Sequence, residues 1–207
     1  MARDIEMKNV SAIVLAAGLS RRFGTSDKLM ARFEGRTLLE HVLDCLAGLG
    51  LGQIVVVTRR DFEALDLLRR DPDLTCIVNE TPEAGMGSSL ALGAEALKPC
   101  TGVFVVLADM PFITPDLYRD MATDLPGHDI VVPVHAGQRG HPVLFASTCF
   151  NVLQRLEGDQ GARGVIDSGS HTVKWHETHS SAVRSDIDTQ MDLRSGSPGR
   201  RKKTHRT

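Results

Sequence analysis

A short apolar run at residues 11–14 leads directly into a segment of small residues, glycines and cations that ends at Lys28. Such a run is typical of a buried strand in a parallel sheet. Glycines after a strand let the backbone approach an anion and turn its N–H groups toward it, while cations neutralise its charge. The segment therefore predicts a polyphosphate site, although an ordinary glycine-rich turn with a solvated basic face is the alternative. It matches neither a P-loop nor a dinucleotide-binding fingerprint.

The rest of the chain alternates apolar runs with segments of helical periodicity, which is typical of βα units on a largely parallel sheet. Further strands are predicted at residues 53–58, 75–79, 103–108, 130–134, 142–145 and 173–175. Helices are predicted at residues 38–49, 61–70, 85–98, 147–156 and 162–168, and another begins at residue 114. We therefore expect an α/β fold, a three-layer α/β/α sandwich with a mostly parallel, Rossmann-like sheet.

The charge distribution separates a main body from a basic end. The 207-residue chain has a formal net charge of −2, yet the last thirteen residues hold five cations and no acid. They begin with a Ser-Gly-Ser-Pro-Gly segment that is typical of disorder. We therefore expect one domain at residues 1–194 and a disordered basic tail at residues 195–207. The tail is either a solvated end or a contact for nucleic acid or for an acidic partner surface.

Composition excludes several classes of protein. No stretch approaches the roughly 18 apolar residues of a membrane span, and the first residues lack a signal-peptide core. We therefore expect a cytoplasmic protein with no membrane partner. One tryptophan and one tyrosine make no stacking platform for nucleic acid. The four cysteines are widely spaced, so reduced thiols are expected rather than a disulfide framework or structural zinc.

Four polar clusters follow predicted strands, at residues 18–28, 79–89, 109 and 139–141. Because ligands bind beyond the carboxyl ends of strands in open α/β sheets, we expect these clusters to converge. Asp109 follows a run of six apolar residues, a position that suits an Mg²⁺ ion shared with phosphate oxygens or, alternatively, a cap on the next turn. A second group of carboxylates lies at residues 186–192.

Several of these segments carry the motifs of one enzyme family. The pattern L-A-A-G-x-S-x-R-x-G with a following lysine, at residues 15–28, resembles the signature of nucleotidyltransferases that activate sugars, alcohols and molybdopterin with a nucleoside triphosphate. Residues 107–113 are similar to the L-A-D-M-P segment of that family. Residues 85–90, 138–145 and 158–163 resemble the G-M-x-x-S-L, R-G-H-P-x-x-F and G-D-x-G-A-R elements of its molybdenum cofactor cytidylyltransferase branch. The resemblance spans about residues 10–193 and implies the nucleotide-diphospho-sugar transferase type of fold.

The resemblance also implies roles for individual residues. Arg22, Lys28 and Asp109 are the predicted catalytic residues, and Asp109 with Asp188 would hold Mg²⁺. Gln190 stands where the family usually has proline. The predicted nucleotide-binding residues are Leu15, Ala16, Ala17, Gly18, Asn79, Gly85, Met86, Ser88 and Ser89. The predicted acceptor-binding residues are Arg139, His141, Asp159 and Arg163.

The activity that the resemblance implies is transfer of CMP from CTP to the terminal phosphate of molybdopterin cofactor, with release of pyrophosphate. A molybdenum hydroxylase would then be a transient client. The alternatives are a related transferase that uses GTP or a sugar or alcohol phosphate, and a non-catalytic cofactor-delivery or nucleotide-sensing protein. A dinucleotide-dependent dehydrogenase is disfavoured, because the second strand ends in Thr58-Arg59-Arg60 instead of an acid.

Overall fold

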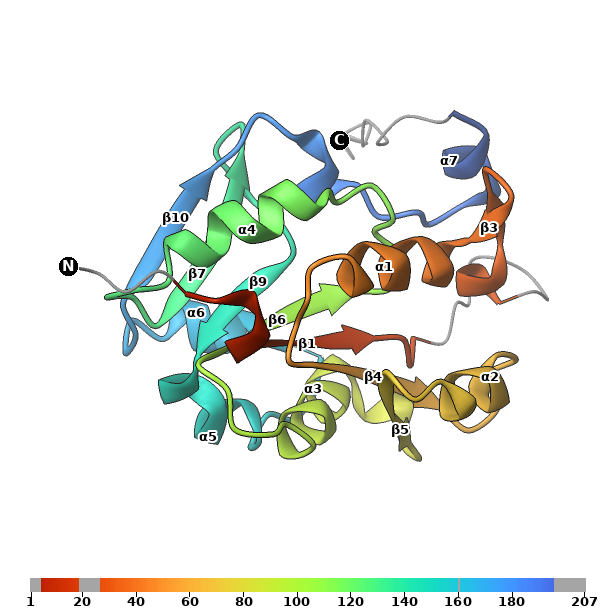
Figure 1. The fold of residues 1–207 in the computed structure, drawn as a ribbon, viewed down its shortest axis with the longest axis horizontal. Coiled ribbons are helices and arrows are strands. Elements are labelled where there is room, and N and C mark those ends of the chain that lie inside the picture. Colours follow the sequence, from red (N-terminus) through yellow and green to blue (C-terminus); the bar gives the residue numbers. More distant parts are fainter. Residues whose placement is uncertain (1–4, 19–26, 160, 196–207) are drawn as a thin grey trace, which may run out of the picture.

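The strands of the computed structural model form one large sheet and one small hairpin, within the described residues 5–18, 27–159 and 161–195 (Figure 1). The large sheet contains β1 (Val10–Leu15), β4 (Gln53–Arg59), β5 (Leu74–Asn79), β6 (Gly102–Leu107), β7 (Ile130–His135), β8 (Gln138–Arg139), β9 (Val143–Ala146) and β10 (Val173–Glu177). The hairpin joins β2 (Arg32–Phe33) to β3 (Arg36–Thr37).

The large sheet has the order β10-β7-β9-β6-β1-β4-β5, and β8 pairs with β7. The pairs β6–β1, β1–β4, β4–β5 and β7–β10 are parallel. Only β9, which is antiparallel to β6 and β7, and the short β8 interrupt this pattern among the described strands. The predicted, mostly parallel sheet is therefore confirmed.

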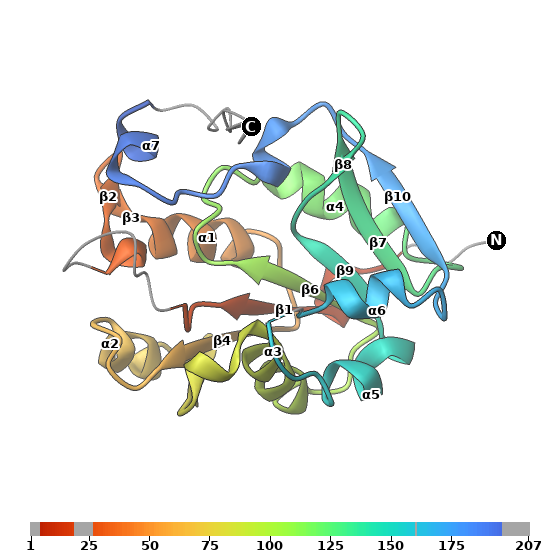
Figure 2. The ribbon, with the colours of Figure 1, turned by 180° about the vertical axis from the view of Figure 1, so that it is seen from behind.

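Helices cover both faces of the sheet and make the molecule three layers thick (Figure 2). They are α1 (Leu38–Ala47), α2 (Leu65–Arg70), α3 (Met86–Glu95), α4 (Pro115–Thr123), α5 (Phe150–Leu153) and α6 (Arg163–Asp167). The last described helix, α7 (Gln190–Ser195), lies beyond the sheet. Side chains alternate along each strand, so Ala12 and Val14 of β1 join a core with α1, α2 and α4. Ile13 faces the opposite way, into a second core with α3, α5 and α6.

The helix predicted at residues 147–156 is a 3-10 turn, Ser147–Cys149, followed by the short α5. The structure differs from the sequence prediction at three further places. Helix α2 begins at Leu65 instead of residue 61, because the Asp61 carboxylate pairs with Arg59 and does not cap a helix. The expected link at residues 135–140 contains strand β8. The β2–β3 hairpin has no counterpart in the prediction, and its turn places Glu34 and Gly35 at positive φ.

The chain returns to the first half of the molecule at its last described helix. Helix α7 lies beside the β2–β3 hairpin in both views (Figures 1 and 2). A small core around Leu38 and Ile187, with Phe33 and Leu193 packed against it, fixes this contact. The acidic residues from 186 onward are thereby brought to the end of β6. Within the described ranges, no helix is long and apolar enough to cross a membrane.

Candidate active site

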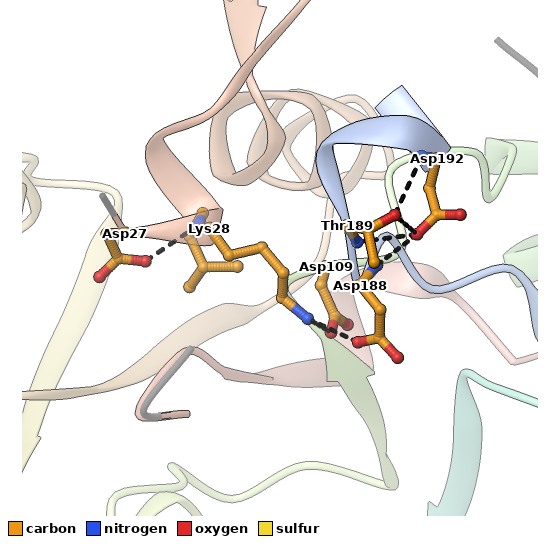
Figure 3. A network of polar contacts seen from close by, with 7 residues as sticks. Asp27, Lys28, Asp109, Asp188, Thr189 and Asp192 are labelled. Carbon is orange, nitrogen blue, oxygen red and sulfur yellow. Dashed lines mark hydrogen bonds and ion pairs between the residues drawn. The ribbon is translucent and has the colours of Figure 1, made fainter. Parts of the chain in front are cut away.

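Lys28 lies at the centre of a network of carboxylates. It begins a short 3-10 helix, Lys28–Met30, which Asp27 caps by accepting a hydrogen bond from the Leu29 N–H at 3.0 Å. The Lys28 ammonium donates to Asp109 at 2.6 Å and to Asp188 at 3.2 Å (Figure 3). Two residues that are 81 positions apart in the sequence thus meet as the strand-end prediction required.

The charge of Lys28 is maintained by this network. The Lys28 side chain is only 13% exposed, and burial by itself lowers its pKa. The ion pairs and hydrogen bonds with Asp109 and Asp188 outweigh burial and raise the pKa above its ordinary value. The side chain is therefore a fixed positive charge throughout the neutral pH range.

Three carboxylates form a candidate metal site. The backbone N–H of Ile187 donates to the carbonyl of Asp109 at 3.0 Å, which aligns the C-terminal segment with the end of β6. Carboxylate oxygens of Asp109, Asp186 and Asp188 then lie within 4.8 Å of one another. Oxygen donors of this kind suit Mg²⁺, which takes few protein carboxylates together with phosphate oxygens. The sequence reasoning assigned Asp109 and Asp188 and missed Asp186.

The turn after Asp188 is held by its own hydrogen bonds. The Asp192 carboxylate accepts from the backbone N–H groups of Asp188 and Thr189, at 3.1 and 2.7 Å. The Thr189 hydroxyl also donates to that carboxylate and accepts from the Asp192 N–H (Figure 3). This reciprocal pattern begins α7 as a capping box would, so Gln190 is the first helical residue. Proline is well tolerated there, and the departure from the family pattern does not disturb the turn.

A cavity of about 550 Å³ opens beside Lys28, and we call it the Lys28 cavity. The end of β1, the end of β6 and the start of α3 line it. Its lining residues include Leu15, Ala17, Gly18, Lys28, Gly85, Met86, Ser89, Asp109, Asp159 and Asp186. Most of the predicted nucleotide-binding residues therefore lie around one space.

A second cavity, of about 460 Å³, adjoins the first and is called here the Arg139 cavity. Its walls are largely apolar, and its charged groups include three arginines. Its lining residues include Met86, Leu90, Val105, Val132, Arg139, His141, Asp159, Arg163, Ile166, Arg184 and Asp186. All four predicted acceptor-binding residues line it. Met86, Leu107, Asp159 and Asp186 line both cavities, so the two spaces meet beside the carboxylates.

The wall between the cavities depends on two glycines at the start of α3. Gly85 has φ +102°, and a Cβ there would lie 2.5 Å from the backbone of Gly158. A Cβ on Gly87 would lie 2.7 Å from the backbone of Glu157, and the Gly87 N–H donates to the Gly158 carbonyl at 2.8 Å. This close approach brings Asp159 into the shared wall.

Among the described residues, four predicted site residues do not line either cavity: Ala16, Asn79, Ser88 and Asp188. Ala16 is buried, and its N–H donates to the Val57 carbonyl. The buried Asn79 amide donates to the hydroxyls of Ser88 and Ser89 at 3.0 and 2.9 Å, and Ser88 donates to the Gly85 carbonyl. These contacts give Asn79 and Ser88 the role of shaping the start of α3. Asp188 instead accepts from Lys28 at 3.2 Å. The predicted residue Arg22 lies outside the described residues.

The two predicted acceptor-binding arginines of the Arg139 cavity contact residues that do not line it. Arg139 pairs with Asp167, and its guanidinium lies 4.7 Å from the centre of the Trp175 ring. Arg163 is mostly exposed and lies 3.6 Å from the same carboxylate. Burial lowers the pKa of His141 although the charge of Asp109 raises it, so the imidazole is neutral at pH 7.

A different group of metal-ligand side chains, Asp129, Cys149 and His171, lies near the opposite end of the strands. Hydrogen bonds from Thr148 and Thr172 lower the pKa of Asp129 to about 2, whereas burial raises the pKa of the Cys149 thiol to about 11. The Asp129 carboxylate thus joins the residues before β7 and β10. We assign this group a structural role.

The sequence of residues 12–174 matches the family model described as the MobA-like NTP transferase domain. The chain belongs to this family. The match begins in β1 and includes Lys28, Asp109 and the Arg139 loop, whereas Arg184 and Asp186 of the cavity linings lie after its end.

Curated relatives of this MobA-like NTP transferase have several names. Nicotine blue oxidoreductase of Paenarthrobacter nicotinovorans is 26% identical over 194 residues, which span 90% of this chain and 95% of that one. Molybdenum cofactor cytidylyltransferase of Escherichia coli K12 is 26% identical over 188 residues, with the same coverage of both chains. A probable molybdenum cofactor guanylyltransferase of Natranaerobius thermophilus is 30% identical over 142 residues, 67% of this chain and 65% of its own.

Among solved structures, that of Rv0371c from Mycobacterium tuberculosis H37Rv is similar. Its TM-score is 0.78 at 28% identity, and the match covers 90% of this chain and 96% of that chain. The same protein has also been solved in complex with manganese, and that structure matches with a TM-score of 0.75. A divalent cation is thus bound by a relative of the same fold.

Proposed function

We propose that this protein is a Mg²⁺-dependent cytidylyltransferase that transfers CMP from CTP to the terminal phosphate of molybdopterin cofactor. One observation carries the proposal: Lys28 and Asp109 contact each other in a cavity that meets a second, largely apolar cavity at Asp159 and Asp186. A group-transfer enzyme needs two substrates with their reacting atoms side by side, and adjoining cavities with a charged centre between them provide that arrangement.

The two cavities receive different substrates in this proposal. The Lys28 cavity takes the nucleotide, because it contains the backbone of Gly18, the ammonium of Lys28 and the polar start of α3. The Arg139 cavity takes the acceptor, because its apolar walls suit a flat ring system while Arg139 and Arg163 suit a phosphate. Both volumes lie within the roughly 300–1,000 Å³ of ordinary ligand pockets.

The reaction is a displacement at the α-phosphorus. A terminal phosphate oxygen of the acceptor forms the new P–O bond, and the bond from the α-phosphorus to the oxygen that leads to the β-phosphate breaks. Pyrophosphate leaves with that electron pair. A phosphate monoester loses its second proton at a pKa of about 6, so the attacking oxygen is ionised near neutral pH and needs no general base.

Catalysis then depends on alignment and on neutralised charge. Lys28, and Arg22 from outside the described residues, would bind the triphosphate and stabilise the charge that develops as pyrophosphate leaves. Asp109, Asp186 and Asp188 would hold the Mg²⁺ ion, which supplies positive charge to the phosphate oxygens when it is bound. The backbone around Gly18 would donate N–H groups to phosphate oxygens.

The choice of CTP rests on the start of α3. Ser89 lines the Lys28 cavity, and Asn79 fixes its hydroxyl and that of Ser88 beside Gly85. Small polar groups of this kind suit a pyrimidine edge or a ribose and leave room for the ring. GTP is the second candidate, because relatives include a probable guanylyltransferase. A cytoplasmic location and a molybdenum hydroxylase client complete the proposal.

The test supplies purified protein with each nucleoside triphosphate, Mg²⁺ and molybdopterin, and measures pyrophosphate. We expect release with CTP above the other nucleotides, and loss of release in Asp109→Asn. Asp120→Asn, on the exposed face of α4, is the matched control and should behave as wild type. Faster release with GTP would overturn the choice of CTP. Nucleotide binding without release would favour the non-catalytic delivery or sensing protein.

A further inference from the structure

Arg59 is a buried arginine whose guanidinium joins two distant parts of the chain. It ends β4 and is 9% exposed. It donates to the Gly18 carbonyl at 2.9 Å and forms an ion pair with the Asp27 carboxylate. Its Nε pairs with Asp61 at 2.9 Å, and the guanidinium lies 5.5 Å from the centre of the Phe62 ring. Arginine is rarely buried without such a set of partners.

The two principal partners of Arg59 flank the glycine-rich segment. Gly18 is its last described residue on the β1 side, and Asp27 is the first on the other side. Asp27 also caps the turn that presents Lys28, through the 3.0 Å hydrogen bond from Leu29. One guanidinium therefore sets the separation between the Gly18 backbone and the Lys28 turn.

We propose that Arg59 is a positioning residue for the nucleotide, a role that rests on the proposed function. It is not among the residues that line either cavity, so it acts through its partners. It fixes the Gly18 backbone and the turn that presents Lys28, and both of these line the Lys28 cavity. The planar fork of arginine donates in two directions at once, which a lysine ammonium on a flexible stem does not reproduce.

The burial of Asp27 determines how the variants should be chosen. The Asp27 side chain is 6% exposed, so Arg59→Met alone would leave a buried carboxylate without its cation. The double variant Asp27→Asn with Arg59→Met removes this charge and keeps a side-chain oxygen for the Leu29 N–H. Arg60→Met is the matched control, because Arg60 is exposed and pairs with Glu80 on the surface.

The experiment measures kcat and both KM values for Arg59→Met, Arg59→Lys, the double variant and Arg60→Met. It also measures hydrogen exchange at the Leu29 amide without ligand. In Arg59→Met we expect the nucleotide KM to rise roughly tenfold and kcat to fall roughly tenfold, with the acceptor KM unchanged. Leu29 should exchange at least several-fold faster. The nucleotide KM and the kcat of Arg59→Lys should lie between those of the wild type and Arg59→Met. Both constants of Arg60→Met should match those of the wild type.

A double variant that folds and keeps the wild-type nucleotide KM would overturn the proposal, because a merely structural role leaves that constant unchanged. Failure of the proposed function gives a different result, in which the wild type itself has no turnover. In that case the positioning role of Arg59 is tested by hydrogen exchange at the Leu29 amide. An unchanged exchange rate in Arg59→Met would overturn that role.

Discussion

The Lys28 cavity and the Arg139 cavity share Asp159 and Asp186 but place their charges differently. In the Lys28 cavity, Lys28 and Asp109 contact each other, and their side chains are 13% and 21% exposed. In the Arg139 cavity, Arg139 and Arg163 are held by Asp167 from outside an apolar space, and both are far more exposed.

This difference in charge placement separates transition-state stabilisation in the Lys28 cavity from substrate affinity in the Arg139 cavity. Recessed charges that contact one another are fixed in place, which favours stabilisation of a transition state. Exposed arginines around apolar walls provide affinity and adapt to the ligand. We therefore expect variants in the Lys28 cavity to change kcat, and variants in the Arg139 cavity to change the KM for the acceptor.

Lys28→Met should have the largest effect. The loss of a buried cation at the reacting phosphate should lower kcat by roughly 10²–10³-fold, as measured by pyrophosphate release. Lys8→Met is the control, because Lys8 is exposed and pairs only with Glu6 among the described residues. A change confined to the nucleotide KM would show that Lys28 contributes only to binding. The expected difference between the cavities, kcat for one and KM for the other, would then be wrong.

Arg139→Met should raise the acceptor KM by roughly tenfold and leave the nucleotide KM unchanged, because one phosphate contact is lost. Arg155→Met, which changes an exposed arginine that lines neither cavity, is the control. Steady-state kinetics with each substrate varied in turn decides the matter. An equal rise in the nucleotide KM would mean that the cavities do not separate the substrates.

Two glycines sharpen the comparison further. Gly85→Ala should destabilise the fold by about 2 kcal/mol, because its Cβ meets the Gly158 backbone and its φ is positive. Gly18→Ala should change stability by less than about 0.5 kcal/mol, since its Cβ would meet no described residue within 4 Å. Its nucleotide KM should nevertheless rise several-fold. Chemical denaturation and kinetics test both, and a destabilised Gly18→Ala would make that glycine structural.

Gln190→Pro should have the smallest effect. The first helical position has no intrahelical partner for its N–H, so proline should stabilise the fold by about 0.5–1 kcal/mol and leave turnover unchanged. Thermal denaturation and pyrophosphate release measure both. A loss of activity would mean that the turn after Asp188 needs the Gln190 N–H.

The sequence predicted the parts of the site that lie at strand ends. Asp109 directly follows one apolar run, and Lys28 ends the glycine-rich segment that follows another. The topology of a parallel sheet brings such positions together. Asp186 was missed although the sequence contains a signal for it. Residues two apart in an extended chain project to the same side, so the assignment of Asp188 to the metal site also pointed to Asp186.

Other features depend on contacts that local patterns do not contain. Arg59 contacts partners 32 and 41 positions away, so in the sequence it is only a basic residue at a strand end. Asn79 and Ser88 were predicted to bind nucleotide because of their polarity. In the structure the Asn79 amide donates to the Ser88 hydroxyl, and that hydroxyl donates to the Gly85 carbonyl. Strand β8 is two residues long, too short for a periodic pattern.

The most direct test of the shared reaction centre is a crystal structure with Mn²⁺ and a CTP analogue whose α,β-bridging oxygen is replaced by methylene. We predict the α-phosphorus beside Lys28, the cation on Asp109 with Asp186 or Asp188, and an open path from that phosphorus into the Arg139 cavity. A nucleotide bound away from Lys28, or a cation away from these carboxylates, would contradict the account.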